Sequence, residues 1–321
     1  MNNKAFWCNN ALPLSILFSI VFLAIYLSLS AAGYLIGLDP NMAVGDVSRW
    51  CERIHHSVVR EPINALSNIS FMVAAIFMIK TIAKDHKTGI TLNQYHGFTP
   101  IVLLYIGGAY FLGPGSMFMH GTNTYWGGWI DNLSMIMYIL IPWLINVKEM
   151  AGWSMRMFVS IYLAIVLIFG ISSWIYDSEM GINLDLWAVS IGLWIISEAL
   201  FRFWSPSFRV ISGFIGFLVA IVFSISPITM LQNFDNYWWI ILFWLPGILA
   251  TQAPQKKRSY NPWFFLGVFF FVAAYYIWEQ GKAGTDWCHP DSLLQLHGIW
   301  HLLCAMATWS FFKFFRTEVA T

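Results

Sequence analysis

Long apolar stretches separated by short polar connections dominate this chain. Ten of them approach the length of about 20 mainly apolar residues that a membrane-spanning helix requires, although the eighth is short. They lie at residues 14–36, 63–82, 100–119, 129–145, 157–176, 184–201, 210–230, 237–250, 263–278 and 292–312. Their continuous apolar runs lack the period-two alternation of barrel strands, which excludes a transmembrane β-barrel. The pattern predicts an all-α, polytopic transmembrane helix bundle of about ten spans.

Composition supports a membrane protein and excludes several other classes. Of 321 residues, 58% are hydrophobic and only 10% are charged, whereas roughly a quarter of the residues in soluble domains are charged. The net charge of +1 offers no basic surface for nucleic acid. No polar block is long enough to fold as a separate soluble domain, so we expect a single integral-membrane domain over 1–321.

The basic residues predict the orientation of the spans. Of the 17 Lys and Arg residues, thirteen fall on the side that holds both termini. The other four are Arg49, Arg53, Arg60 and Lys282. Because basic residues favour the cytoplasmic side, we expect both termini in the cytoplasm, with a bacterial inner membrane or a eukaryotic endomembrane as the host. The first apolar run is long for the core of a secretory signal, so a membrane anchor is favoured over a cleaved signal.

Five polar side chains are expected at the opposite, non-cytoplasmic face. The third span runs outward, the fourth returns and the tenth starts on the outer side. Their outer ends carry Ser116, His120, Asp131, His297 and His301. Residues from distant parts of the sequence are therefore predicted to converge on a periplasmic or lumenal site.

The spacing of these residues indicates a zinc site. His297 and His301 are four residues apart, so a helix presents both imidazoles in one direction. With His120 they supply three ligands and leave a fourth position for water, as in catalytic zinc sites. Asp131 is then a candidate base for the zinc-bound water, or a residue that supports the metal site without binding the metal itself. The alternative is a set of interfacial histidines, but the cost of ionisable groups inside a membrane favours the metal site.

Three blocks of the sequence resemble the alkaline ceramidase family. These are "GPGSMFMHGTNTYWGGWIDNLSM", "DSLLQLHGIWHLL" and "WCERIHHSVVREPINALSN". The family lies within a superfamily of intramembrane hydrolases that includes the adiponectin receptors. The resemblance implies that His120, His297 and His301 bind zinc, that Asp131 helps to activate water and that Ser116 steadies the oxyanion.

The implied reaction is the hydrolysis of ceramide, a membrane lipid, to a fatty acid and a sphingoid base. Two alternatives stay open: a hydrolase of another acyl lipid, and a receptor-like or transporting protein with a structural zinc. The oligomeric state is not indicated by the sequence.

The resemblance also implies a calcium site, which this chain matches only in part. Trp50, Glu52 and Glu61 match the expected residues, but Arg49 and Ile54 stand where two ligands are expected. Calcium needs six to eight oxygen ligands. A direct ion pair of Arg49 with Glu52 or Glu61 is therefore favoured over bound Ca²⁺.

The chain is longer than the seven-span core of that family. One extra span is expected within residues 1–40, ahead of a core over 61–321. Two inserted spans are expected within 210–278, which makes about three additional spans.

Two of the four cysteines, Cys51 and Cys288, fall in outer connections, where disulfides persist. We predict that they form a disulfide; the alternative is two free thiols on the same side.

Overall fold

The computed structural model describes residues 3–35, 37–39, 42–55 and 58–321. Long helices dominate it and the strands are only two residues long, which confirms the all-α prediction. The chain forms two compact units, one of Met1–Ser134 with Arg258–Val319 and one of Met135–Lys257 with Ala320–Thr321. The single domain predicted over 1–321 stays a prediction.

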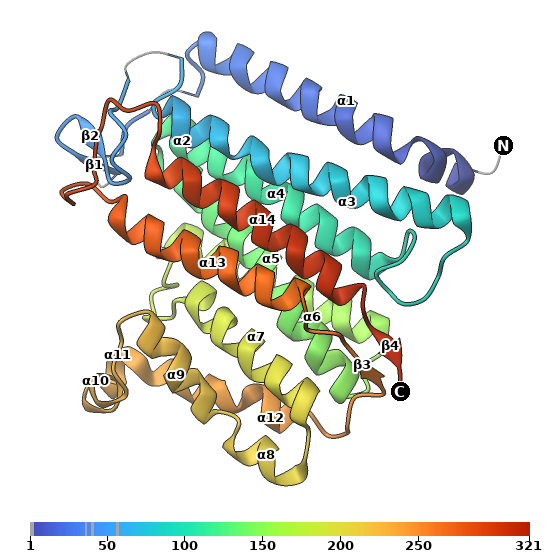
Figure 1. The fold of residues 1–321 in the computed structure, drawn as a ribbon. Coiled ribbons are helices and arrows are strands. Elements are labelled where there is room, and N and C mark those ends of the chain that lie inside the picture. Colours follow the sequence, from blue (N-terminus) through green and yellow to red (C-terminus); the bar gives the residue numbers. More distant parts are fainter. Residues whose placement is uncertain (1–2, 36, 40–41, 56–57) are drawn as a thin grey trace. The chain divides into compact units, whose positions relative to one another are not determined.

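The first unit contains the long helices at both ends of the chain (Figure 1). They are α1 (Asn3–Ala31), α3 (Ile69–Thr88), α4 (Pro100–Thr122), α13 (Trp263–Gln280) and α14 (Leu296–Phe315), with the short α2 (Pro62–Ser67) and the antiparallel strands β1 (Ala43–Val44) and β2 (Val47–Ser48). Helix α14 packs against α13, α3 and α2, and α3 also packs against α1 and α4. Helix α14 is thus surrounded by other helices of this unit.

Local sequence signals start and end α4. The Thr99 side chain accepts a hydrogen bond from the Val102 backbone N–H at 3.2 Å, and Pro100 occupies the first turn. Proline is well tolerated there because the first N–H groups of a helix have no internal partner. Asn123 ends the helix in the left-handed conformation, with φ of 49°. This cap places His120 in the last turn of α4.

The second unit contains the middle of the chain. Helix α5 (Tyr125–Met150) begins in the first unit and continues into the second, which also holds α6 (Met155–Ile175) and α7 (Leu186–Phe203). Short elements follow: α8 (Pro206–Ile211), α9 (Phe214–Val222), α10 (Pro227–Gln232), α11 (Phe234–Tyr237), η2 (Trp238–Trp244), α12 (Leu245–Leu249) and β3 (Lys256–Lys257). The last strand of the chain is β4 (Val319–Ala320).

Seven helices among the described residues are long and apolar enough to cross a membrane. They are Cys8–Ala31, Pro62–Thr88, Pro100–Thr122, Tyr125–Met150, Met155–Ile175, Leu186–Phe203 and Trp263–Gln280. The predicted count of ten is therefore not confirmed. Helix α14 is not among the seven, because its histidines and Lys313 lower its mean hydropathy. The predicted end of the first span, at residue 36, lies outside the described residues.

The seventh and eighth predicted spans, 210–230 and 237–250, are not continuous helices. Pro206, Pro227 and Pro246 each occupy a first-turn position, so that new helices begin there. A proline inside a helix removes one backbone hydrogen bond and clashes with the preceding turn. Apolar length alone predicted continuous spans where the structure has short helices, two of which begin at prolines inside the predicted ranges, Pro227 and Pro246.

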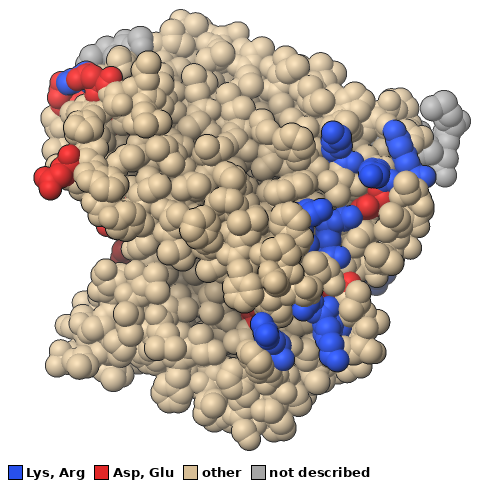
Figure 2. All heavy atoms as spheres, in the orientation of Figure 1, with Lys and Arg blue, Asp and Glu red and all other residues tan. Residues whose placement is uncertain are grey.

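Basic and acidic side chains of the first unit gather at different ends of its helices. Figure 2 shows Lys and Arg gathered over the ends of α3 and α14, and acidic side chains near β1 and β2. At the basic end, the Arg316 guanidinium donates to both oxygens of Asp85, at 2.6 and 2.9 Å, and to the Tyr95 carbonyl at 2.7 Å. These bonds join the end of α14 to the last turns of α3 and to the α3–α4 connection.

Candidate metal centre

Three histidines meet inside the first unit. His120 comes from the last turn of α4, and His297 and His301 come from the first two turns of α14. Their side chains are 1%, 5% and 3% exposed, and one ligand nitrogen from each lies within 4.8 Å of the others. The three histidines that were expected to converge do lie together, and this group could hold a metal ion.

Hydrogen bonds at Nδ1 fix the tautomers of the His120 and His301 rings. These Nδ1 atoms are called the outer nitrogens below, and the Nε2 atoms the inner nitrogens. His120 Nδ1 lies 2.8 Å from Glu61 Oε2, and a carboxylate can only accept. His301 Nδ1 lies 2.7 Å from Ser67 Oγ, whose hydroxyl donates to the Asn64 carbonyl at 2.7 Å. Both Nδ1 atoms therefore carry the proton. The Nε2 lone pairs of His120 and His301 are left available for a metal.

The distance between two of the inner nitrogens is suited to binding one small divalent cation. His120 Nε2 and His297 Nε2 lie 3.1 Å apart. Two imidazole nitrogens bound tetrahedrally to one zinc at about 2.0–2.1 Å would be separated by about 3.3 Å. Three neutral imidazoles are also the ligand set of known catalytic zinc sites. The residues present therefore fit Zn²⁺.

Glu61 is the centre of a buried polar cluster behind His120. The side chain is 0% exposed, and its carboxylate also accepts hydrogen bonds from Asn64 Nδ2 at 2.9 Å and Asn123 Nδ2 at 2.7 Å. The Glu61 backbone N–H donates to the His120 carbonyl at 3.0 Å. Ring orientation and carboxylate position are thus set together by the end of α4 and the start of α2.

Glu52 has a different environment, although it is also buried. Its two carboxylate oxygens accept from the backbone N–H groups of Ile63 and Asn64, both at 2.7 Å. Burial raises the pKa of Glu52 to about 7, against the opposite effect of these two hydrogen bonds. Glu52 thereby satisfies backbone donors at the start of α2.

The ion pair suggested for Arg49 is not found among the described residues. Its guanidinium carbon instead lies 5.5 Å from the centre of the Trp50 ring. Glu52 and Glu61 are bonded to the backbone and amide groups described above. The group of three or more metal-binding side chains found in the described ranges is the histidine group. A calcium site at Trp50, Glu52 and Glu61 stays a prediction.

Ser116 and Asp131 lie beside the histidines. Ser116 Oγ, on α4, is 3.4 Å from His301 Nε2, and Ser116 is also a side-chain hydrogen-bond partner of Asp131 in the first turns of α5. Gly115 allows this close approach, because a Cβ there would lie 2.6 Å from Ser134 Oγ on α5. The arrangement can bring a hydroxyl and a carboxylate to a ligand held by the imidazoles.

Sequence reasoning missed three residues that support the histidines. Ser67 and Asn64 lie in the block "NALSN", which was part of the family resemblance but carried no assigned role. Their signal was present, since both follow Glu61 at helical spacing. Asn123 had no sequence signal, because its contact with Glu61 depends on how the α4 end meets the loop before α2.

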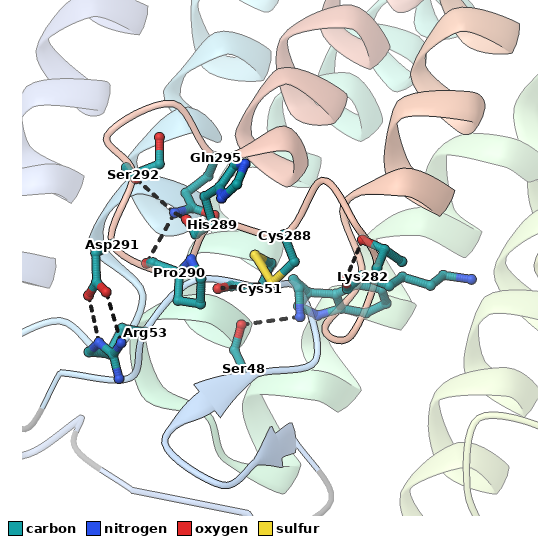
Figure 3. Close-up of a disulfide and its surroundings, with 12 residues drawn as sticks. Ser48, Cys51, Arg53, Lys282, Cys288, His289, Pro290, Asp291, Ser292 and Gln295 are labelled. Carbon is teal, nitrogen blue, oxygen red and sulfur yellow. Dashed lines mark hydrogen bonds and ion pairs between the residues drawn. A yellow bond between two sulfur atoms is a disulfide. The ribbon is translucent and has the colours of Figure 1, made fainter.

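The predicted disulfide between Cys51 and Cys288 is confirmed (Figure 3). The two Cα atoms are 5.5 Å apart, and 237 residues separate the cysteines in the sequence. Cys8 and Cys304 are free thiols. The bridge joins the loop that carries Trp50 and Glu52 to the connection that precedes His297.

Comparison with known proteins supports the resemblance seen in the sequence. A family model described as Ceramidase matches residues 47–320, which is most of the chain. The comparison of this chain with curated proteins found no match. Helix α1 lies ahead of the matched residues, whereas the histidines, Ser116 and Asp131 all fall within them.

Proposed function

This chain belongs to the ceramidase family, and we propose that it is a zinc-dependent hydrolase that cleaves ceramide into a fatty acid and a sphingoid base. The family implies a hydrolase acting on amide bonds. The observation that carries the proposal is the set of three buried imidazoles whose ligand nitrogens lie within 4.8 Å of one another. His120, His297 and His301 would hold the zinc.

The surrounding side chains support amide hydrolysis. Bound zinc would supply a Lewis acid for the amide carbonyl and would lower the pKa of water toward 7. The Asp131 carboxylate accepts a proton from the attacking water and passes it to the leaving nitrogen. The Ser116 hydroxyl donates to the carbonyl oxygen as negative charge develops there. One C–N bond breaks, one C–O bond forms, and the products are a carboxylic acid and an amine.

Outer partners keep the imidazoles ready for the metal. The Glu61 carboxylate and the Ser67 hydroxyl hold the outer nitrogens of His120 and His301. Such partners fix the ring orientation and the tautomer of metal-binding histidines. A structural zinc, as in the receptor-like alternative, would gain nothing from the Ser116–Asp131 pair, so the hydrolase is the better supported function.

The location of the site is also part of the proposal. We expect both termini in the cytoplasm and the histidine site toward the periplasmic or lumenal face. The concentration of basic side chains at the ends of α3 and α14 supports this orientation. A C-terminal fusion to a reporter that is active only in the cytoplasm tests it, and an inactive reporter on an expressed, folded fusion would contradict it.

The activity test uses purified, zinc-loaded protein in detergent with long-chain ceramide. The wild-type protein should release fatty acid and sphingoid base in equal amounts, and His297→Ala should abolish the release without loss of the fold. His86→Ala, at an exposed histidine of α3, is the matched control and should keep full activity. Full activity in His297→Ala would refute the proposal. Release of acid from an ester-linked acyl lipid alone would favour a different substrate class.

A further inference from the structure

The three histidines of the candidate metal centre are not held in the same way. His120 and His301 have hydrogen-bond partners at their outer nitrogens, Glu61 and Ser67. His297 Nδ1 is buried and has no hydrogen-bond partner among the described residues. Metal-binding histidines almost always use this second nitrogen to fix the ring. A different contact must therefore orient His297.

That contact is the indole ring of Trp50. The two ring centres are 4.7 Å apart and the planes differ by 17°, so the rings are stacked. His120 and His301 meet the His297 ring at steep angles of 58° and 80°, and neither limits its rotation in this way. The Trp50 ring also contacts the Trp278 ring on α13, with ring centres 5.5 Å apart.

The loop that carries Trp50 is itself fastened on both sides of the indole. On one side, the Ala283 N–H donates to the Arg49 carbonyl at 3.0 Å. On the other side, Cys51 is bonded to Cys288 (Figure 3). Both partners belong to the connection between α13 and α14, which leads directly to His297. The position of Trp50 over the imidazole is thus fixed by the chain segment that also carries that imidazole.

A second set of bonds reinforces this attachment. The Arg53 N–H donates to the Pro290 carbonyl at 3.0 Å, and the Arg53 guanidinium donates to both oxygens of Asp291, at 2.6 and 2.8 Å (Figure 3). These hydrogen bonds lower the pKa of Asp291. The loop therefore has no freedom to withdraw Trp50 without breaking several bonds.

We propose that Trp50 is a positioning residue for His297, which fixes the plane of this imidazole by stacking where a hydrogen bond fixes the other two. The inference rests on the proposed metal site. An imidazole that binds a divalent cation becomes more positive, and the face of an indole attracts positive charge. The stack therefore favours the metal-bound form of His297 as well as its orientation.

The test measures zinc affinity, by competition with a chromophoric chelator, on metal-depleted full-length protein. Trp50→Met and Trp50→Leu keep an apolar side chain without an aromatic face and should each raise the zinc Kd about 10-fold, in line with the loss of a partner that orients a metal ligand. Trp50→Phe keeps the stack and should stay within about threefold of the wild type. Trp287→Met, at an exposed tryptophan of the same connection, is the matched control and should leave the Kd unchanged.

A double-mutant cycle separates positioning from a general effect on the fold. In a His297→Ala background, Trp50→Met should have no further effect on zinc affinity, because the residue that it positions is absent. An unchanged Kd in Trp50→Met and Trp50→Leu would overturn the inference, and so would an equal loss with and without His297. A wild-type chain that binds no zinc would overturn the proposed function as well, so the two failures are distinguishable.

Discussion

Glu61→Gln is the substitution that tests the proposed metal site most directly. Glu61 Oε2 lies 2.8 Å from His120 Nδ1, and the side chain is 0% exposed. Glutamine has nearly the same shape and can still accept from His120 through its amide oxygen. Its amide nitrogen would face Asn123, whose Oδ1 has no hydrogen-bond partner among the described residues and can accept after a flip of the amide. The substitution therefore removes the charge while the hydrogen bonds can be kept.

The expected loss follows from the role of the carboxylate. A charge-assisted hydrogen bond is roughly twice as strong as a neutral one. Loss of an outer partner of a metal ligand typically weakens metal binding about 10- to 100-fold, which corresponds to about 1.4 to 2.7 kcal/mol. Because glutamine keeps the hydrogen bond, we expect about 10-fold for Glu61→Gln. Glu61→Ala removes the bond too and should approach about 100-fold.

Zinc affinity and the thermal unfolding midpoint of the metal-free protein are the two measurements. Glu61→Gln should lower the zinc affinity and leave the unfolding midpoint of the metal-free protein nearly unchanged. A zinc Kd within twofold of the wild type would refute the assignment of Glu61 as the partner of His120. If the wild-type activity required calcium and the activity of the variant did not, Glu61 would be a calcium ligand instead.

Three further predictions concern other parts of the first unit. Gly121→Ala should destabilise the protein by about 1–3 kcal/mol, because a Cβ there would overlap the Tyr26 hydroxyl; thermal unfolding measures this, and Tyr26→Phe should recover part of the loss. Ser116→Ala should lower kcat about 10²- to 10³-fold with unchanged zinc content; an unchanged kcat would remove Ser116 from the mechanism. Burial and the nearby Arg316 lower the pKa of His96. Stability from this group is therefore present above about pH 6.5 and falls as the pH drops toward the folded-state pKa; thermal midpoints between pH 8 and pH 5 should fall less in His96→Gln.

The sequence predicted the histidine group better than it predicted the number of spans. The spacing of His297 and His301 and the charge bias of the connections predicted that three histidines lie together, and the structure groups them. The same apolar-length criterion predicted continuous spans at 210–230 and 237–250, where the structure has short helices. Pro227 and Pro246 were visible in the sequence, but hydropathy averages over a window and does not register a single broken hydrogen bond.

Arg49 shows why local charge is a poor guide to pairing. The sequence placed a cation next to two carboxylates and thereby favoured an ion pair. The Arg49 backbone is instead bonded to Ala283, and its guanidinium lies over the Trp50 ring. The carboxylates are occupied by donors from α2 and the α4 end, which no reading of neighbouring residues could identify.

By itself, the sequence determined which residues can take part in the metal site. An apolar chain in a membrane must pair its backbone N–H and C=O groups within helices, and helical spacing aligns residues four apart. The pairing of Cys51 with Cys288 also followed from sequence, because topology puts both on one side. Only the tertiary structure decided how each imidazole is held. Glu61 and Ser67 leave the inner nitrogens of two histidines free, and Trp50 orients the third by stacking. Hydrogen bonds and ring contacts have ranges of a few ångströms, so they depend on the packing of segments that lie far apart in the chain.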